Sequence, residues 1–237
     1  MQIMLKMQVA IDGPAGSGKS TAARQVAKQL GYLYIDTGAL YRAVALVAVR
    51  QGVDLNDSAT LANLAKSIDL EVRMQPDGSP VYFIAGKEVT DALRSPEIND
   101  RVSQVAKLAA VRERVTEKLQ ALGDEKGIVM DGRDIGTVVL PSADIKVFLT
   151  ADLATRVQRR QQELSNRGFF VSAARVEEEV RQRDREDANR QVAPLKPAPD
   201  ACVVDTTNLN PEEVVSTIVE LAKQRAQNRT SQGRNSR

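Results

Sequence analysis

The chain has 237 residues, enough for one α/β domain with insertions, and its 42% hydrophobic and 27% charged residues are typical of globular proteins. It contains no histidine and one cysteine, Cys202, which excludes serine–histidine triads, zinc sites that need imidazole, and internal disulfides. The net charge is +2, although five basic and no acidic residues follow position 222. With 3% aromatic residues, no long apolar run and no signal-peptide pattern, we expect a cytoplasmic protein without nucleic-acid or membrane partners.

Five short, apolar and β-rich segments predict the buried parallel strands of an α/β fold, because most of them are joined by helical stretches. They cover residues 8–12, 32–36, 127–131, 145–149 and 201–205. Four of the five end in aspartate. Since ligands bind at the carboxyl ends of parallel strands, these acids are expected to surround one crevice.

Residues 68–91 interrupt the alternation of strands and helices. Segments 69–74, 81–85 and 88–90, with a turn at 75–78, predict a meander of three antiparallel strands. We interpret this meander as a small inserted subdomain.

The second half of the chain is predicted to be mostly helical. A long amphipathic helix is expected over about residues 96–122, and residues 152–193 carry nine arginines on two helices. Three prolines, the first at Pro194, end this section. The polar, basic residues after about 224 are expected to be disordered, and residues 1–6 to be an alternative start or a leader outside the fold.

The sequence GPAGSGKS matches the phosphate-binding pattern GxxxxGK[ST] directly after a predicted strand and before a predicted helix. Glycines let backbone N–H groups turn toward a phosphate, and the helix N-terminus adds its dipole. Lys19 is expected to reach the β- and γ-phosphates of ATP, and the Ser20 hydroxyl to bind Mg²⁺. A chance glycine-rich turn is the alternative, which four matched positions in this context disfavour. The residues predicted to bind ATP are Gly13, Pro14, Ala15, Gly16, Ser17, Gly18, Lys19, Ser20 and Thr21.

A phosphate-binding loop occurs in kinases, GTPases and nucleic-acid ATPases alike. The chain has no NKxD sequence, and Asp131-Gly-Arg-Asp134 has the wrong order for a DxxG switch, which disfavours a GTPase. The excess positive charge lies in the tail rather than in a folded patch, which disfavours a nucleic-acid ATPase. Phosphoryl transfer to a small molecule is favoured. A kinase for UMP, AMP or shikimate, and a regulatory or nucleic-acid-binding ATPase that uses the tail, stay open as alternatives.

Two further clusters indicate an acceptor site. In Asp36-Thr-Gly-Ala-Leu-Tyr-Arg42, Thr37 occupies an expected helix N-cap and Arg42 lies one turn further, so that both can converge on an anion. Simple capping and a solvated arginine would explain them equally well. The segment Asp131-Gly-Arg-Asp134 follows the third strand, beside the phosphate loop in a doubly wound order. Its two acids and one arginine favour a site over a plain turn.

The motifs GPAGSGKST, DTGALYR, SQVAKLAAVR, DGRDIGTVVLP and RDREDANRQVAPL, in this order, resemble those of bacterial cytidylate kinases. The resemblance extends from Met7 to about Ala222, with Thr37 where some relatives have serine. It implies a P-loop NTPase three-layer α/β fold with a five-stranded parallel sheet, an inserted antiparallel NMP-binding subdomain and a helical lid. The implied parts of this single kinase domain of residues 1–237 are a core at about 7–66, 99–151 and 191–223, the insertion at about 67–98, the lid at about 152–190 and the tail at about 224–237.

The resemblance also implies the reaction, which is transfer of the γ-phosphoryl group of ATP to CMP or dCMP in the presence of Mg²⁺. Among the residues it implies, Asp134 is a natural acceptor for the N4 amino group that distinguishes cytosine from uracil. For Ser103 a structural role within its helix is equally compatible. We expect a monomer, because no heptad seam requires a partner. The residues implied for CMP are Thr37, Arg42, Ser103, Arg112, Arg133, Asp134, Arg183, Asp187 and Arg190, of which Arg42, Arg133 and Arg190 would hold the phosphate.

The implied lid carries arginines that are candidates for catalysis together with Lys19 and Arg133. Arg156 shares a helix face with Arg159 or Arg160. Cations brought to the transferring phosphoryl group would stabilise its charge while water is excluded, so we assign catalytic roles to Arg156 and Arg160. A solvated basic helix paired with glutamates is the alternative.

A last pattern lies at the end of the lid. Arg183, Asp187 and Arg190 are spaced i, i+4 and i+7, which predicts one ligand-facing stripe on a helix that Pro194 ends. An exposed ion pair between Arg183 and Asp187 is the alternative.

Overall fold

The computed structural model describes residues 6–75, 79–124 and 127–235, with side chains as far as residue 228. The chain divides into two compact units. The first contains the residues before Asp36, the segment that ends at Asn189, and the residues from Ala193 onward. The second contains residues 36–124 and 190–192. These units differ from the predicted core, insertion and lid, because the predicted lid falls in the first unit and part of the predicted core in the second.

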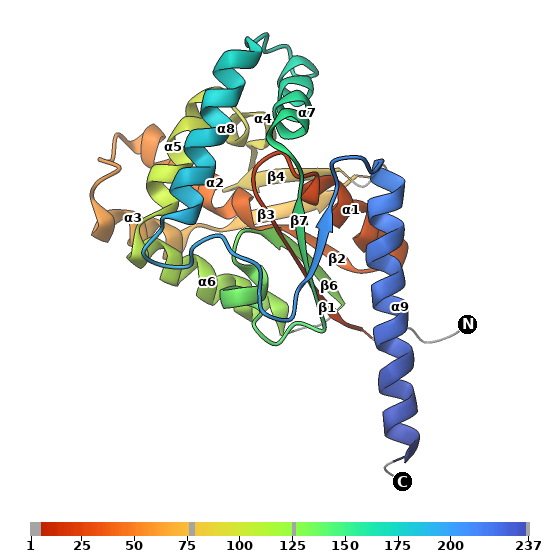
Figure 1. Ribbon diagram of the computed structural model, residues 1–237. Helices are drawn as coiled ribbons and strands as arrows, with labels where there is room; N and C mark the ends of the chain where they lie inside the picture. The colour runs from red at the N-terminus through yellow and green to blue at the C-terminus, as the bar shows by residue number, and fades with distance from the viewer. Residues whose placement is uncertain (1–5, 76–78, 125–126, 236–237) are drawn as a thin grey trace. The chain divides into compact units, whose positions relative to one another are not determined.

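The first unit is built on a five-stranded sheet with the strand order β2-β6-β1-β7-β8 (Figure 1). β1 pairs in parallel with both β6 and β7, and β7 pairs in parallel with β8. All five predicted strands are present, each within one residue of its predicted ends. The strands are β1 (Gln8–Asp12), β2 (Leu33–Asp36), β6 (Ile128–Gly132), β7 (Ile145–Thr150) and β8 (Cys202–Asp205).

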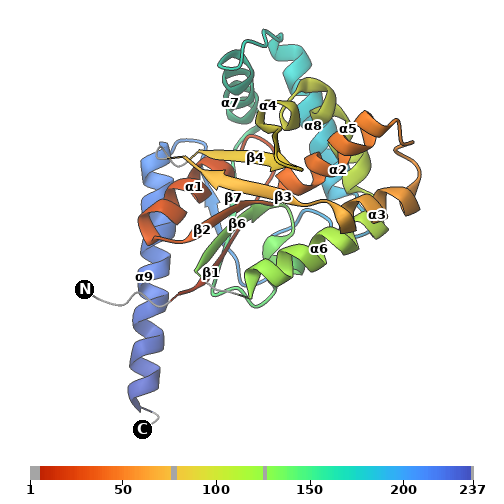
Figure 2. The ribbon, with the colours of Figure 1, turned by 180° about the vertical axis from the view of Figure 1, so that it is seen from behind.

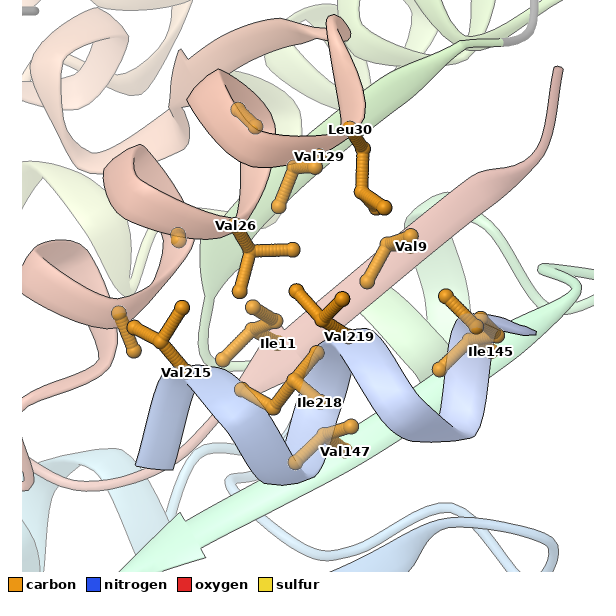
Figure 3. Packing of buried hydrophobic residues seen from close by; sticks show 14 of the residues in the cluster. Val9, Ile11, Val26, Leu30, Val129, Ile145, Val147, Val215, Ile218 and Val219 are labelled. Atoms are coloured by element: carbon orange, nitrogen blue, oxygen red, sulfur yellow. The ribbon is translucent and has the colours of Figure 1, made fainter. Parts of the chain in front are cut away.

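Two helices pack against one face of this sheet, α1 (Lys19–Leu30) and α9 (Pro211–Asn235). Figure 3 shows Val26 of α1 and Ile218 of α9 directed toward Ile11 in the central strand β1. All three side chains are completely buried. Because buried apolar surface contributes about 25 cal/mol per Å², this cluster holds the start of α1 firmly against the end of β1.

The arginine-rich region forms the predicted pair of helices, α7 (Leu153–Ser165) and α8 (Ala173–Ala188), which lie side by side in both views (Figures 1 and 2). A π-helical turn, η1 (Ile135–Val139), follows β6. Helices α7 and α8 share a small apolar cluster made of Val157, Leu164, Val176 and Val180.

The second unit contains the predicted antiparallel meander, in the order β3-β4-β5. Residues 76–78 of the predicted turn lie outside the described residues. Helices surround the meander in sequence, and Figure 2 shows β3 and β4 side by side. The elements are α2 (Thr37–Gln51), α3 (Ser58–Ser67), β3 (Leu70–Met74), β4 (Pro80–Ile84), β5 (Lys87–Glu88), α4 (Thr90–Leu93), α5 (Pro96–Ala106) and α6 (Ala109–Gly123).

The single long helix predicted over residues 96–122 is wrong, since α5 and α6 are separate helices. Both Val105 and Val111 are fully buried. At about 100° per residue, six residues would place them about 120° apart on a continuous helix. The break at Lys107 and Leu108 lets each helix bury its own apolar side, and neither glycine nor proline marks it in the sequence.

The predicted disorder of the C-terminal tail is also not observed, because α9 continues to Asn235. The tail contains lysine, arginine, glutamine and alanine from Lys223 to Gln227, all of which favour helix, so that the apolar first half of α9 can extend into it. Within the described part of the chain, no helix is both long and apolar enough to cross a membrane.

Candidate active site

The phosphate-binding loop lies between β1 and α1, as the sequence predicts, and its shape depends on glycine. Gly16 has a φ of +75°, and a Cβ atom there would lie 2.7 Å from the backbone oxygen of Arg156. A Cβ atom on Gly13 would lie 2.1 Å from the backbone oxygen of Leu149 at the end of β7. Any side chain at either position would therefore push the loop away from its neighbours.

Polar groups of the loop lie where they can bind a phosphate. Lys19, which is 7% exposed, donates from Nζ to the backbone oxygen of Pro14 at 3.0 Å, so that its charge lies over the loop. The hydroxyl of Ser17 is buried and has no hydrogen-bond partner within the described residues. Because α1 begins at Lys19, its first N–H groups and its dipole add to a site suited to an anion.

A carboxylate reaches this loop from the neighbouring strand. Asp131 is the last residue but one of β6 and is 2% exposed. Its Oδ2 accepts a hydrogen bond of 2.6 Å from the Ser20 hydroxyl, and its Oδ1 accepts one of 2.8 Å from the Tyr34 hydroxyl. The Ser20 and Asp131 oxygens are hard donors of the kind that Mg²⁺ prefers. The described residues hold no group of three or more acidic or cysteine side chains placed for a metal ion.

A second buried carboxylate, Asp12 at the end of β1, supports the loop after β6. Its two oxygens each accept a backbone N–H bond of 2.7 Å, from Ile135 and Gly136. Burial raises the pKa of Asp12 from 3.8 to about 6, against the two N–H bonds, which lower it. The carboxylate of Asp134 adds to the increase, and the Arg133 guanidinium opposes it.

The segment after β6 contains two of the predicted acceptor residues, Arg133 and Asp134, and α8 supplies a third. Asp134 is 5% exposed and precedes η1. Arg133 donates from Nε to Asp187 of α8 at 2.7 Å, and Asp187 is 1% exposed. The structure therefore joins Asp187 to Arg133, and Asp187 is buried rather than exposed as the alternative interpretation requires.

The predicted stripe of Arg183, Asp187 and Arg190 on one helix is wrong in its last member. α8 ends at Ala188, with Asn189 as its C-cap, and Arg190 belongs to the second unit. The backbone N–H of Leu195 instead bonds the carbonyl of Asp187, so that the chain turns back at the end of the helix. The helix thus ends six residues before Pro194.

The three arginines Arg156, Arg159 and Arg160 of the predicted lid all contact protein groups. Arg156, 8% exposed, donates from Nη1 to the Ala15 carbonyl of the phosphate loop at 3.3 Å and to Asp184 of α8 at 2.7 Å. Arg159 binds the hydroxyl and backbone oxygen of Thr206 at 2.9 and 2.7 Å. Arg160 pairs with Glu163 and Glu179, as the alternative interpretation of this helix describes. Arg156 and Arg159 thus reach the loops at the sheet edge, and Arg160 does not.

In the second unit, Asp36 organises the start of α2. Its Oδ1 accepts the N–H of Ala39 at 3.1 Å, so Asp36 is the N-cap and the predicted capping role of Thr37 is wrong. Thr37 is the first helical residue and is 3% exposed. The other oxygen of Asp36 binds Arg42 at 2.6 Å and lies 3.7 Å from Arg94. Two guanidinium groups therefore share one carboxylate at this helix terminus.

The remaining predicted residues of the second unit lie on α5 and α6. Arg112 is 3% exposed, donates to the Ala106 carbonyl at 3.2 Å and lies over the ring of Tyr41, with 5.4 Å from its Cζ to the ring centre. A guanidinium buried in this way is fixed in orientation. Ser103 is half-buried on α5, and its backbone oxygen accepts the N–H of Lys107.

The chain matches the family model described as cytidylate kinase over residues 9–224. A cytidylate kinase from Bacillus licheniformis is 46% identical over 222 residues, which cover 94% of this chain and 98% of that protein. The chain belongs to the cytidylate kinase family. A cytidylate kinase from Pelotomaculum thermopropionicum is 49% identical over 89% of this chain and 93% of its own length. A crystal structure of an uncharacterized protein from Eubacterium ventriosum has a TM-score of 0.51 at 10% identity, over 92% of this chain and 99% of that one, which shows the fold alone.

Sequence analysis assigned no individual role to several residues that contact the candidate site residues. Each of them is identified by the group that it contacts in the folded chain. Asp12 was predicted only as a strand-ending acid. Asp36 and Asp131 were also part of the two predicted acceptor clusters, but without a role of their own, and no sequence pattern indicated Tyr34, Arg94 or Asp184.

Proposed function

We propose that this protein transfers the γ-phosphoryl group of ATP to CMP or dCMP, which yields ADP and CDP or dCDP. The observation that carries the proposal is the juxtaposition of two loops on neighbouring strands. The phosphate loop follows β1, and the segment with Arg133 and Asp134 follows β6. Groups that suit a donor triphosphate and groups that suit a nucleotide acceptor thus stand at one edge of the sheet, in a chain of the cytidylate kinase family.

On the donor side, the loop and Lys19 bind the phosphates of ATP. Backbone N–H groups and the N-terminus of α1 supply fixed dipoles, and Lys19 supplies a full charge. Ser20 and Asp131 would hold Mg²⁺ together with the phosphates. When bound, the ion would neutralise charge on the β- and γ-phosphates.

On the acceptor side, we assign recognition of cytosine to Asp134 and binding of the CMP phosphate to Arg133 and Arg42. A buried carboxylate that accepts the N4 amino group loses that bond with uracil, which discriminates by about 1–3 kcal/mol. Arg42 and Arg133 each pair with an acid, Asp36 and Asp187, and a phosphate can take the place of such an acid. We keep Ser103, Arg112, Arg183 and Arg190 as proposed CMP contacts.

In-line transfer between two bound nucleotides needs no covalent enzyme intermediate. The chain contributes by holding donor and acceptor in line, by excluding water and by placing cations near the transferring group. Arg156 is well placed for this, because it contacts the phosphate loop through Ala15. We propose the same role for Arg160, which requires that it leave Glu163 and Glu179.

The test is a panel of nucleoside monophosphates with Mg·ATP, with ADP release measured by a coupled assay. We expect CMP and dCMP to be phosphorylated, UMP less well, and AMP and GMP poorly. Lys19→Ala is the control that shows that turnover depends on the phosphate loop, and it should lose kcat almost completely while staying folded. ATP hydrolysis that ignores CMP but rises with DNA or RNA would contradict the proposal.

A further inference from the structure

Three acids of helix α8 pair with arginines from other elements. Glu179 pairs with Arg160 of α7, and the other two are Asp187 and Asp184. Asp187 binds Arg133 of the acceptor loop at 2.7 Å, and Asp184, one turn earlier, binds Arg156 of α7 at 2.7 Å. Asp187 belongs to the residues implied by the family resemblance. Asp184 contacts an arginine that touches the donor loop, and the function proposed above gives it no role.

Three contacts fix Arg156 against the phosphate loop. Its Nε donates to the Ala151 carbonyl at 3.1 Å, and its Nη1 donates both to Ala15 and to Asp184. Its backbone also packs directly on Gly16. Two of the three hydrogen-bond acceptors are main-chain oxygens, so Asp184 is the one that a substitution can remove.

The ion pair is not what holds α7 and α8 together. Val157 and Leu164 of α7 pack against Val176 and Val180 of α8, and all four are buried. This apolar cluster supplies the helix contact, so the loss of one carboxylate need not separate the helices. In addition, Oδ1 of Asp184 is buried and has no hydrogen-bond partner within the described residues. A carboxylate selected only to stabilise the fold would be expected to use both oxygens.

We propose that Asp184 is a positioning residue, which holds the Arg156 guanidinium in the orientation that serves the phosphates of the donor nucleotide. This inference rests on the proposed function. An arginine held in one orientation loses little side-chain freedom when phosphate charge develops beside it, whereas a released arginine must be ordered at that moment. The effect of Asp184 therefore passes through Arg156.

The experiment is a double-mutant cycle with Asp184→Ala, Arg156→Ala and the double variant. We expect Asp184→Ala to lower kcat about tenfold, with KM for CMP changed less than twofold. In the Arg156→Ala background the same substitution should change kcat by less than twofold, because the arginine it positions is gone. Asp184→Asn, which keeps one acceptor oxygen, should recover part of the activity. Glu177→Gln removes another acid of α8, one paired with Arg181 on the surface, and should leave kcat unchanged.

Three results would overturn the proposal: wild-type kcat in Asp184→Ala, losses that multiply in the double variant, or a loss that follows a matching fall in melting temperature. ATP affinity, measured by calorimetry on the same four proteins, provides a readout that needs no acceptor. It should weaken severalfold in Asp184→Ala and be equal in the two variants that lack Arg156. If wild-type protein binds ATP but phosphorylates no cytidine nucleotide, the proposed function fails, and the calorimetric cycle still decides whether Asp184 acts through Arg156.

Discussion

Asp12 and Asp131 lie at the carboxyl ends of neighbouring strands and are almost equally buried, yet their hydrogen-bond partners differ in kind. In the β1–β6 register Ile11 lies opposite Asp131 and Asp12 opposite Gly132, so the two acids stand one step apart. Asp12 accepts two backbone N–H groups, and Asp131 accepts two hydroxyl groups. A backbone N–H cannot turn away without moving the chain, whereas a hydroxyl rotates freely. We infer from this comparison that Asp12 fixes the loop after β6, whereas the carboxylate of Asp131 remains able to bind a ligand.

The largest effect that this comparison predicts is on Asp131. Asp131→Asn keeps the shape of the side chain but removes the negative charge next to Ser20. We expect turnover to fall more than a hundredfold, because a metal-bound phosphate typically gains several kcal/mol in the transition state, while the melting temperature changes little. Steady-state kinetics over a Mg²⁺ titration measure this, with Glu177→Gln as the control. Retention of more than a tenth of wild-type kcat at saturating Mg²⁺ would remove Asp131 from the donor site.

The next effect concerns the proton on Asp12. Its pKa is raised from 3.8 to about 6, so the folded state binds a proton between these values that the unfolded state has released. The free energy of unfolding therefore falls as the pH rises through this window, by about 3 kcal/mol in total. Asp12→Asn does not titrate and should lack this contribution.

Denaturant unfolding of wild-type protein and Asp12→Asn at several values between pH 4 and pH 7 isolates this group, because all other acids are shared. The difference in unfolding free energy, wild type minus variant, should decrease steadily with pH. A difference that stays constant would show that Asp12 titrates near its ordinary value and that the two N–H bonds offset the effect of burial.

The sequence predicts both acids as strand ends but cannot tell them apart. Strand-ending aspartates follow from short apolar runs, and the parallel sheet places them at one edge, as observed. Their roles depend on partners that are distant in the chain: Ile135 is 123 residues from Asp12, and Ser20 is 111 residues from Asp131. No local pattern records such pairings, which arise only when β6 takes its place beside β1.

Helix ends show the same limit. The i, i+4, i+7 spacing would place Arg183, Asp187 and Arg190 on one face of a continuous helix. It does not predict where that helix ends. The turn that closes α8 depends on Leu195 reaching back to Asp187, which is a contact of the folded chain. The phosphate loop was predictable in full because its glycines, lysine and serine are contiguous and its function requires them in that order.

A third prediction tests whether Asp12 shapes the acceptor loop. In Asp12→Asn the amide NH₂ would face one of the N–H groups of Ile135 and Gly136, and one bond is lost. That loss costs about 1–3 kcal/mol, but removal of a buried charge recovers a similar amount at pH 7. We therefore expect stability to change little and kcat/KM for CMP to fall roughly tenfold, because Arg133 and Asp134 precede the displaced turn. If kcat/KM for CMP and the affinity for ATP fall by the same factor, the substitution has instead disturbed the sheet edge as a whole.

The smallest effect is expected at Tyr34, which is 4% exposed and donates its hydroxyl to the oxygen of Asp131 that faces away from Ser20. Tyr34→Phe removes this donor and keeps the ring that packs in the apolar cluster of β1, α1 and α9. Asp131 keeps its charge and its bond with Ser20, so only its orientation is relaxed. We expect a two- to fivefold increase in the Mg²⁺ concentration needed for half-maximal rate, with kcat reduced less than threefold, since this is an indirect contact. The same assay on Tyr32→Phe, which removes a hydroxyl that accepts the Met7 N–H in this sheet, should show no such shift. If Tyr34→Phe matches Asp131→Asn in its loss of turnover, the hydroxyl bonds of Asp131 are as essential as the backbone bonds of Asp12, and the contrast between the two acids disappears.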